Sequence, residues 1–274
     1  MLDASTFNPG QPYKVTAPDG KTLIVIKHTS DQLPVTFALM ATRARNKVAI
    51  RLSGGCKGMS PENKVDMLEY FAAAFRGFEG MIWSGGTRQV NSEGLIDPMV
   101  TDVPGVIAAQ NPLCIALGSC PRTDVLNLQG DSQLVLDGYG TRPNPGISGL
   151  LIVQNGPDGK LNWDGDLGDV FGLMENLLTH GGFYRAGVIA WNGGPITRDE
   201  IIRSAKRGWP TIIVRGSGRV CDELADLIES GDEKLNTEVG GNRIHVVRKE
   251  NPRSLRAALL GHGFILGEMD EFDE

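Results

Sequence analysis

The sequence lacks the cysteine and histidine spacings that mark a metal site or a disulfide framework. It has no Cys-x-x-Cys pair and no cysteine–histidine cluster at zinc spacing. Its four cysteines, Cys56, Cys114, Cys120 and Cys221, are therefore expected to be free thiols, as is usual in a reducing cytoplasm. We expect a cytoplasmic protein with no metal and no resident cofactor.

A long apolar segment and an excess of positive charge are also absent. The first residues, MLDASTFNPGQPYKV, contain no apolar signal core, and no run of about 18 apolar residues follows. The formal net charge is −6 at pH 7, whereas proteins that coat nucleic acid are usually basic. We expect no membrane span and no nucleic-acid partner, although a local basic pocket for a phosphate remains compatible with this charge.

Three common catalytic or phosphate-binding fingerprints are missing as well. The P-loop pattern Gly-x-x-x-x-Gly-Lys-Ser/Thr does not occur. Gly216-x-Gly218 is followed by Cys221 where the third glycine of the dinucleotide fingerprint belongs. No Gly-x-Ser-x-Gly turn supports a hydrolase triad.

The sequence does contain an alternation of short β-branched runs and longer helical patterns. Strands are predicted at 22–27, 48–52, 81–86, 113–118, 134–138, 149–156, 186–194, 211–215 and 243–247. Helices are predicted at 34–45, 63–77, 169–182, 198–207, 220–229 and 252–263. This order predicts an α/β fold, a doubly wound Rossmann-like and mostly parallel sheet with helices on both faces. We expect one domain over residues 21–266, an N-terminal appendage at 1–20 and an acidic tail at 267–274.

Glycine is abundant, at 36 residues, and it often falls in pairs directly after apolar runs. Carboxyl ends of parallel strands lie along one edge of a sheet, where ligands bind, so these turns are expected to converge on an anion site. A tight turn that only glycine adopts cheaply is the alternative explanation for each pair. The expected ligand-binding residues of the four turns are Gly54, Gly55, Lys57 and Gly58; Gly85, Gly86 and Thr87; Gly193 and Gly194; and Gly216, Ser217, Gly218 and Arg219.

The turn at 216–219 ends with an arginine where a helix begins. A cation is unfavourable at a helix N-terminus, and a bound phosphate would offset that cost. The unpaired N–H groups of a helix N-terminus also attract anions. Asp222, three residues on, is expected to cap the helix, to pair with Arg219 or to accept a hydrogen bond from a ribose hydroxyl.

The segment Gly216-Ser217-Gly218-Arg219-x-x-Asp222, after a Pro-Thr-Ile-Ile-Val strand, resembles the nucleotide-sensing SLOG superfamily. It is most similar to the branch (LSDAT) of the N-terminal region of TRPM channels and their prokaryotic relatives. Trp83-Ser84-Gly85-Gly86-Thr87 is similar to the Gly-Gly-Thr turn of that branch, and Asn144-Pro145 with GLLIVQNGPDGK (149–160) resembles its hairpin. The resemblance covers residues 45–230 and implies a nucleotide or nucleotide-derived ligand, such as one like ADP-ribose.

The same superfamily contains phosphoribohydrolases of the lysine-decarboxylase-like type, with the signature Pro-Gly-Gly-x-Gly-Thr-x-x-Glu. The matching stretch runs from Asn192 to Glu200, and it keeps two glycines, Thr197 and Glu200. The leading proline and the third glycine are absent, since Ile196 occupies the glycine position. The alternative explanation for Thr197 and Glu200 is a capping box that opens a helix at 198.

Three functions are consistent with these residues. The first is a binding or sensing module, with phosphate at the glycine turns and Arg219, and ribose hydroxyls at Asp222 or Glu200. The second is an enzyme that cleaves the N-glycosidic bond of a nucleoside monophosphate with help from Glu200. The third is a scaffold that keeps the fold without a ligand. For the sensor we expect the signal to pass to a separate effector protein or through a homo-oligomer.

Overall fold

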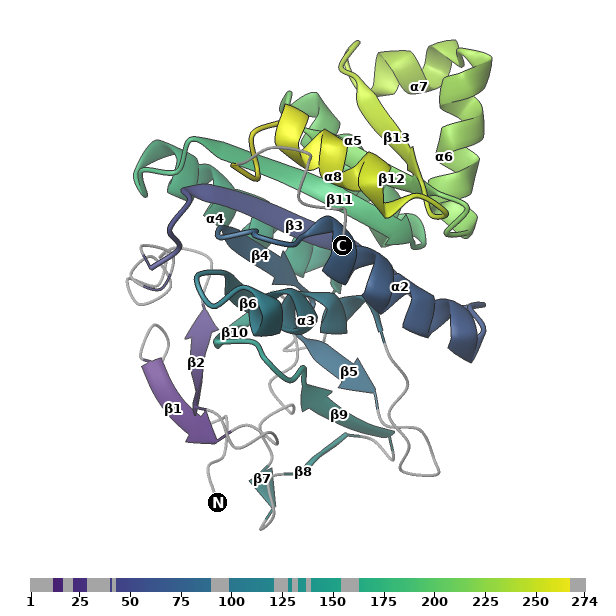
Figure 1. Ribbon diagram of the computed structural model, residues 1–274. Coiled ribbons are helices and arrows are strands. Elements are labelled where there is room, and N and C mark those ends of the chain that lie inside the picture. Colours follow the sequence, from purple (N-terminus) through teal and green to yellow (C-terminus); the bar gives the residue numbers. More distant parts are fainter. Residues whose placement is uncertain are drawn as a thin grey trace.

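Nine strands form the main sheet of the computed structural model, which describes residues 12–16, 22–28, 40, 43–89, 99–120, 128–129, 133–136, 139–153 and 163–266 (Figure 1). Their order across the sheet is β1-β2-β10-β6-β4-β3-β11-β12-β13. Every neighbouring pair is parallel except β1 with β2. The strands are β1 (Pro12–Thr16), β2 (Thr22–His28), β3 (Val48–Gly55), β4 (Met81–Ser84), β6 (Ile115–Cys120), β10 (Gly149–Val153), β11 (Arg185–Asn192), β12 (Thr211–Arg215) and β13 (Ile244–Arg248).

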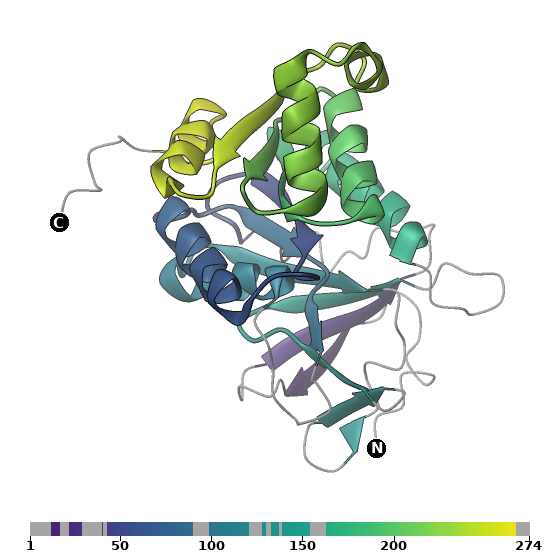
Figure 2. The same cartoon turned by 90° about the vertical axis from the view of Figure 1, so that its right-hand side faces the viewer.

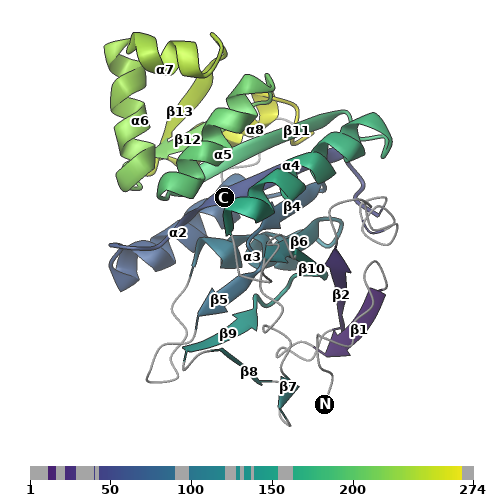
Figure 3. The ribbon, with the colours of Figure 1, turned by 180° about the vertical axis from the view of Figure 1, so that it is seen from behind.

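Helices cover both faces of this sheet. On one face α2 (Pro61–Ala74), α3 (Val103–Gln110) and α8 (Pro252–Gly261) pack over a core that includes Ile50, Leu52 and Trp191. The other face is covered by α4 (Trp163–Thr179), α5 (Pro195–Lys206), α6 (Arg219–Ser230) and α7 (Glu233–Glu238). In Figure 1, α2, α3 and α8 lie in front of the sheet. Figure 3 shows the molecule from behind, and there α4 and α5 lie in front of the sheet. Figure 2 shows helices on both sides of the sheet. The predicted doubly wound, mostly parallel fold is confirmed.

The central strands are buried on both faces, which explains their apolar sequences. In β3, Ile50 and Leu52 face the core under α2, whereas Arg51 and Ser53 reach Glu200 of α5 on the other face. The alternation of side chains along a strand requires this separation. An arginine in the middle of β3 is therefore carried into the protein interior by the register of the strand.

A second, four-stranded antiparallel sheet lies beside the main one, in the order β5-β9-β8-β7 (Figure 1). Its strands are β5 (Thr87–Gln89), β7 (Leu128–Gln129), β8 (Gln133–Leu136) and β9 (Tyr139–Pro143). The strand predicted at 134–138 thus exists as β8, but it belongs to this sheet. Strands β5, β7 and β9 were not predicted, because strands of two to five residues leave too short a pattern for periodicity to detect.

Two helices were also missed. Helix α3, with the sequence VPGVIAAQ, contains a proline and a glycine that argue against a helix. Gly105 is needed there because a Cβ atom would lie 1.9 Å from the carbonyl oxygen of Pro145. Helix α7 has only six residues. Of the predicted helix at 34–45, the structure describes residue 40, which is helical, and residues 43–45, which are not. The rest of that helix and the hairpin residues 154–160 lie outside the described residues.

Residues 12–16, assigned from sequence to the N-terminal appendage, form β1 and pair with β2 at the edge of the main sheet. None of the described helices combines the length and hydrophobicity that crossing a bilayer requires.

Candidate functional site

The winding direction of the sheet reverses at β3. The chain adds β4 and β6 on one side of β3, and later adds β11, β12 and β13 on the other. Gly54 of β3 lies opposite Trp191 of β11, and Gly55 lies opposite Asn192. In open α/β sheets, ligands bind in the crevice outside the strand carboxyl ends at such a reversal. The crevice here lies between the turn at 54–58 and the turn at 192–194.

Asn192 links three of the four predicted glycine turns. Its backbone N–H donates to Ser217 Oγ at 2.8 Å, and its side-chain Nδ2 donates to the carbonyl oxygen of Lys57 at 3.3 Å. A Cβ atom on Gly218 would lie 3.3 Å from Asn192 Oδ1. These contacts join segments that are far apart in the sequence, so the turns at 54–58, 192–194 and 216–219 meet at one edge of the sheet.

A cavity of about 390 Å³, which we call the edge pocket, opens at this place. Six predicted ligand residues line it, four of them from three of the four turns and two from α5. Its wall also contains Arg51, Ser53 and Ile196, which the sequence analysis did not assign to a site. The predicted residues in its lining are Gly54, Gly85, Thr87, Gly194, Thr197 and Glu200.

The fourth turn reaches the edge pocket through Arg219. A Cβ atom on Gly194 would lie 2.9 Å from Nη2 of Arg219, so the guanidinium lies beside a residue of the pocket wall. Arg219 has a φ of 46°, and Asn192 has a φ of 56°; they are the two non-glycine residues with positive φ in the described part of the chain. Backbone strain of this kind clusters at functional sites.

The remaining predicted residues have other positions. Gly216 and Ser217 line a separate cavity between α2 and the ends of β11, β12 and β13. Asp222 accepts a hydrogen bond from the Gly216 N–H at 2.6 Å and so closes the turn, whereas no side chain caps α6, whose N-cap is Gly218. Gly55, Lys57 and Gly58 belong to the turn between the two cavities and line neither of them.

Several of the glycines have a mechanical reason to be glycine. At Gly54, a Cβ atom would lie 2.2 Å from the Trp191 carbonyl oxygen. At Gly86, with a φ of 70°, it would lie 2.4 Å from Gly118 Cα on β6. At Gly193, with a φ of 84°, it would collide with the side chain of Thr197. A neighbouring backbone at Gly54 and Gly86, and the Thr197 side chain at Gly193, therefore account for these three glycines without a ligand, whereas at Gly55 a Cβ atom would meet nothing within 4 Å.

The floor of the edge pocket is a buried ion pair. Arg51 donates from Nε and Nη2 to Glu200 Oε1, at 2.9 and 2.8 Å, and Ser53 Oγ donates to Glu200 Oε2. Burial raises the pKa of the Glu200 carboxyl, and the charge and hydrogen bond of Arg51 oppose that rise. Among the described residues, Nη1 of Arg51 is buried and has no hydrogen-bond partner. One donor of this cation is thus left for a further acceptor.

The predicted capping box is wrong. Helix α5 begins at Pro195, its N-cap is Gly194, and no side chain caps it. Thr197 and Glu200 are consequently buried residues within the helix, and both line the edge pocket. Proline is favoured at the first helical position, which moves the start of the helix three residues upstream of the expected 198. The unpaired N–H groups at this N-terminus, a suitable place for an anion, lie at the pocket wall.

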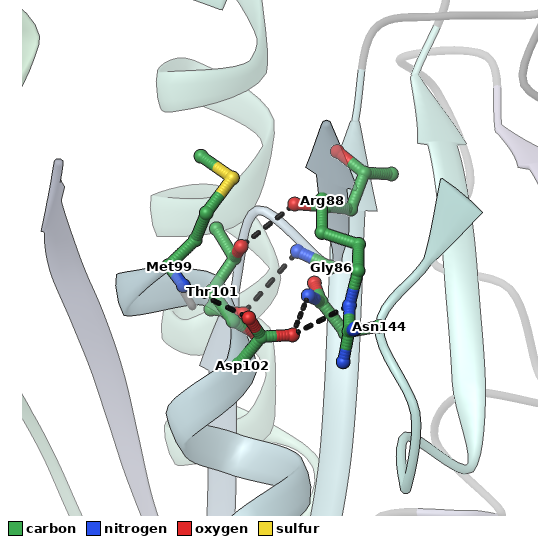
Figure 4. Close-up of polar contacts among 8 residues, drawn as sticks. Gly86, Arg88, Met99, Thr101, Asp102 and Asn144 are labelled. Carbon is green, nitrogen blue, oxygen red and sulfur yellow. Dashed lines mark hydrogen bonds and ion pairs between the residues drawn. The ribbon is translucent and has the colours of Figure 1, made fainter. Parts of the chain in front are cut away.

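Another wall of the edge pocket is held by a second polar cluster (Figure 4). This wall, from Met99 to Thr101, leads into the short 3-10 helix η2 (Val100–Asp102). Buried Asp102 accepts hydrogen bonds from Arg88 Nε at 3.0 Å, Asn144 Nδ2 at 2.5 Å and the Met99 N–H at 2.9 Å. The hydroxyl of Thr101 donates to the Thr87 carbonyl oxygen at 2.6 Å. The cluster ties the antiparallel sheet to the pocket wall.

Residues 167–255, from α4 to the start of α8, match the family described as "SLOG in TRPM, prokaryote". The match confirms the resemblance predicted from the Gly-Ser-Gly-Arg segment and supports a nucleotide-binding or nucleotide-sensing module in general. The chain is also similar to a solved structure titled "Function and structure of the molybdenum cofactor carrier protein MCP from Chlamydomonas reinhardtii", at 14% identity and a TM-score of 0.44 over 80% of this chain and 98% of that one. No curated protein matches the chain.

Proposed function

We propose, from the family match over residues 167–255 and the geometry of the edge pocket, that the chain binds a nucleotide or nucleotide-derived ligand whose phosphate lies at the carboxyl edge of β3 and β11. The observation that carries the proposal is the buried Arg51 Nη1, which has no partner among the described residues and belongs to a side chain of the pocket wall. A buried donor without an acceptor is costly, and a phosphate oxygen would remove that cost.

Two further features favour an anion at this place. The N-terminus of α5 has no side-chain cap and lies in the wall of the edge pocket, so its N–H groups and partial positive charge are available to an anion. Arg219, beside Gly194, adds a cation that has no ion pair with any residue in the described part of the chain. Together they supply backbone and side-chain donors of the kind that hold phosphate.

Cleavage of an N-glycosidic bond is the second candidate, because Glu200 lines the edge pocket beside Arg51 and Ser53. Two observations weigh against it. Both carboxylate oxygens of Glu200 already accept hydrogen bonds, and Ile196 stands where the enzymes' motif has a glycine that lets backbone amides approach the phosphate. Binding without chemistry is therefore the function that we propose, with ADP-ribose as the representative ligand.

The test is a calorimetric and thermal-shift screen with AMP, ADP, ATP, NAD, ADP-ribose and cyclic nucleotides, followed by analysis of the recovered ligand. We expect a raised melting temperature, because a ligand that binds only the folded state stabilises it by mass action. Arg219→Ala should abolish the shift. Arg243→Ala is the matched control, since Arg243 is an exposed arginine directly before β13, at the opposite edge of the sheet.

Each outcome has a distinct meaning. An intact ligand and a shift that only Arg219→Ala removes would support the proposed binding module. Free base recovered from a monophosphate would establish the hydrolase instead. The absence of a shift with every nucleotide would leave the scaffold as the explanation of the fold.

A further inference from the structure

A second cavity, of about 470 Å³, shares no lining residue with the edge pocket, and we call it the α2 pocket. It is bounded by α2 on one side and by the ends of β11, β12 and β13 on the other. We infer, on the basis of the proposed function, that this pocket holds the nucleoside of the ligand whose phosphate lies at the glycine turns.

The α2 pocket is close along the chain to the predicted anion ligands. Met59, Trp191 and Ser217 line the α2 pocket, and each lies two or three residues from a predicted anion ligand: Lys57, Gly194 and Arg219, respectively. Three residues of extended chain span at most about 10 Å. These residues of the α2 pocket therefore lie within about 10 Å of the predicted anion ligands, and a ligand anchored at the turns can extend into the α2 pocket.

The lining of the α2 pocket has an excess of negative charge. Asp66, Glu69 and Glu250 contribute three carboxylates to the α2 pocket, against one ammonium group from Lys249. A phosphate would be repelled by this lining. Hydroxyl and amino groups of a sugar and a base are donors that carboxylates accept. The charge of the two places thus favours the phosphate of the ligand at the turns and its neutral, donor-rich portion under α2.

The lining of the α2 pocket also contains a buried hydrogen-bond donor, the indole N–H of Trp191. Trp191 is 3% exposed and lines the α2 pocket, and its indole Nε1 has no hydrogen-bond partner among the described residues. Its ring is fixed by Tyr70 and Phe71 at centroid distances of 5.3 and 5.5 Å. A buried N–H of this kind needs an acceptor. The oxygen and ring nitrogen atoms of a nucleoside are hydrogen-bond acceptors, and a nucleoside is small enough to fit this cavity.

The test uses a substitution that fills the pocket. Ala73 of α2 lines the cavity, whereas its neighbour Ala72 does not and has the same intermediate exposure. Ala73→Phe should weaken binding of ADP-ribose by about tenfold or more, because the ring occupies the space of the nucleoside. It should leave the affinity for inorganic pyrophosphate unchanged. Ala72→Phe should leave both affinities at the wild-type value. Glu250→Gln provides a second variant that adds no bulk, and it should weaken ADP-ribose binding without weakening pyrophosphate binding.

Circular dichroism and melting temperatures would establish that each variant is folded. Equal ADP-ribose affinity in the wild type, Ala73→Phe and Glu250→Gln would overturn the inference and leave the phosphate site standing. Loss of pyrophosphate binding in the folded Ala73→Phe variant would also overturn it, because the two subsites would then not be separate. Failure of the wild type to bind either probe would instead refute the proposed function.

Discussion

At the scale of single residues, the interaction between Arg51 and Glu200 decides how the edge pocket is built. Both side chains are buried, and the pair is completed by the hydroxyl of Ser53. A buried charge that loses its partner is much more costly than the loss of both charges. The pair therefore acts as a unit, and its two members should not contribute independently to stability.

A double-mutant cycle on this pair is the first prediction. Glu200→Leu and Arg51→Met should each lower the free energy of unfolding by about 3–5 kcal/mol, because each leaves one buried charge unpaired. The double variant should be more stable than the sum predicts by about 1–3 kcal/mol. Urea unfolding measures all four proteins. Additive losses would show that the two side chains are not coupled.

The second prediction concerns His262, which follows α8. Its pKa is lowered by burial, by His245 on β13 and by Arg185 on β11, whose guanidinium donates to the His262 carbonyl oxygen. The folded protein therefore binds fewer protons at this site than the unfolded chain, whose histidine titrates near pH 6.5. The contribution to stability is complete above about pH 6.5 and is lost as the pH falls toward the lowered folded-state pKa.

His262→Gln should flatten this pH dependence between about pH 7.5 and pH 5 in urea unfolding. His180→Gln, an exposed histidine at the end of α4, is the control and should keep the wild-type slope. An unchanged slope in His262→Gln would contradict the assignment.

Site residues in turns could be predicted from the sequence, whereas site residues in strands could not. Glycine, lysine and arginine in turns are visible in a sequence, and six of the predicted residues do line the edge pocket. Arg51 was missed because an arginine within an apolar run indicates a site residue only when its strand is known to be buried. Asn192 was seen only as the start of a turn, because its contacts with Lys57 and Ser217 join segments that are distant in sequence.

At the scale of elements, the turn between β4 and β5 shows that packing between strands can require a glycine, here Gly86, without any contact with a ligand. Gly86 lies against Gly118 of β6, with a Cα–Cβ separation that would be 2.4 Å in an alanine variant. Gly58, with a φ of 82°, has no atom within 4 Å of the corresponding position, and Gly55 has neither a positive φ nor a close neighbour. Alanine variants at these three positions therefore distinguish the cost of a steric clash from the cost of a left-handed backbone conformation.

The third prediction is the order of three alanine variants in urea unfolding without ligand. Gly86→Ala should destabilise by about 2–5 kcal/mol, because it combines a left-handed φ with overpacking. Gly58→Ala should cost about 1–2 kcal/mol, from the left-handed φ alone. Gly55→Ala should change stability by no more than about 0.5 kcal/mol. A Gly86→Ala variant as stable as Gly58→Ala would exclude the close contact with β6.

Element boundaries show the limits of local patterns. The long strands and helices were predicted because their apolar periodicity is strong, and α6 was expected at 220–229 and occurs at Arg219–Ser230. The start of α5 was misplaced because Thr197 and Glu200 have the spacing of a capping box, while Pro195 competes for the first helical position. Only the packing of Thr197 against Gly193 and of Glu200 against Arg51 decides between these starts.

At the scale of the whole molecule, the site exists because the order of strands differs from their order in the sequence. β3 and β11 are separated by more than 120 residues and lie side by side (Figure 1). The alternation of strands and helices predicts a parallel sheet, but it does not reveal which strands are neighbours. The edge where a ligand is expected could be predicted from sequence, whereas the pairing that forms the edge pocket and the α2 pocket could not.

The last prediction follows from this arrangement. A ligand at the carboxyl edge should slow amide hydrogen exchange in three separate segments at once, 54–59, 191–197 and 216–219, because the three turns surround one site. Exchange with and without ADP-ribose, followed by mass spectrometry, measures this protection. Residues 231–243, which include α7 and precede β13, provide an internal control and should exchange at an unchanged rate. Because stabilisation of the whole fold would slow all cooperatively opening amides together, protection that extends equally to 231–243 would indicate global stabilisation. Protection of one turn alone would mean that the ligand does not lie where the three turns meet.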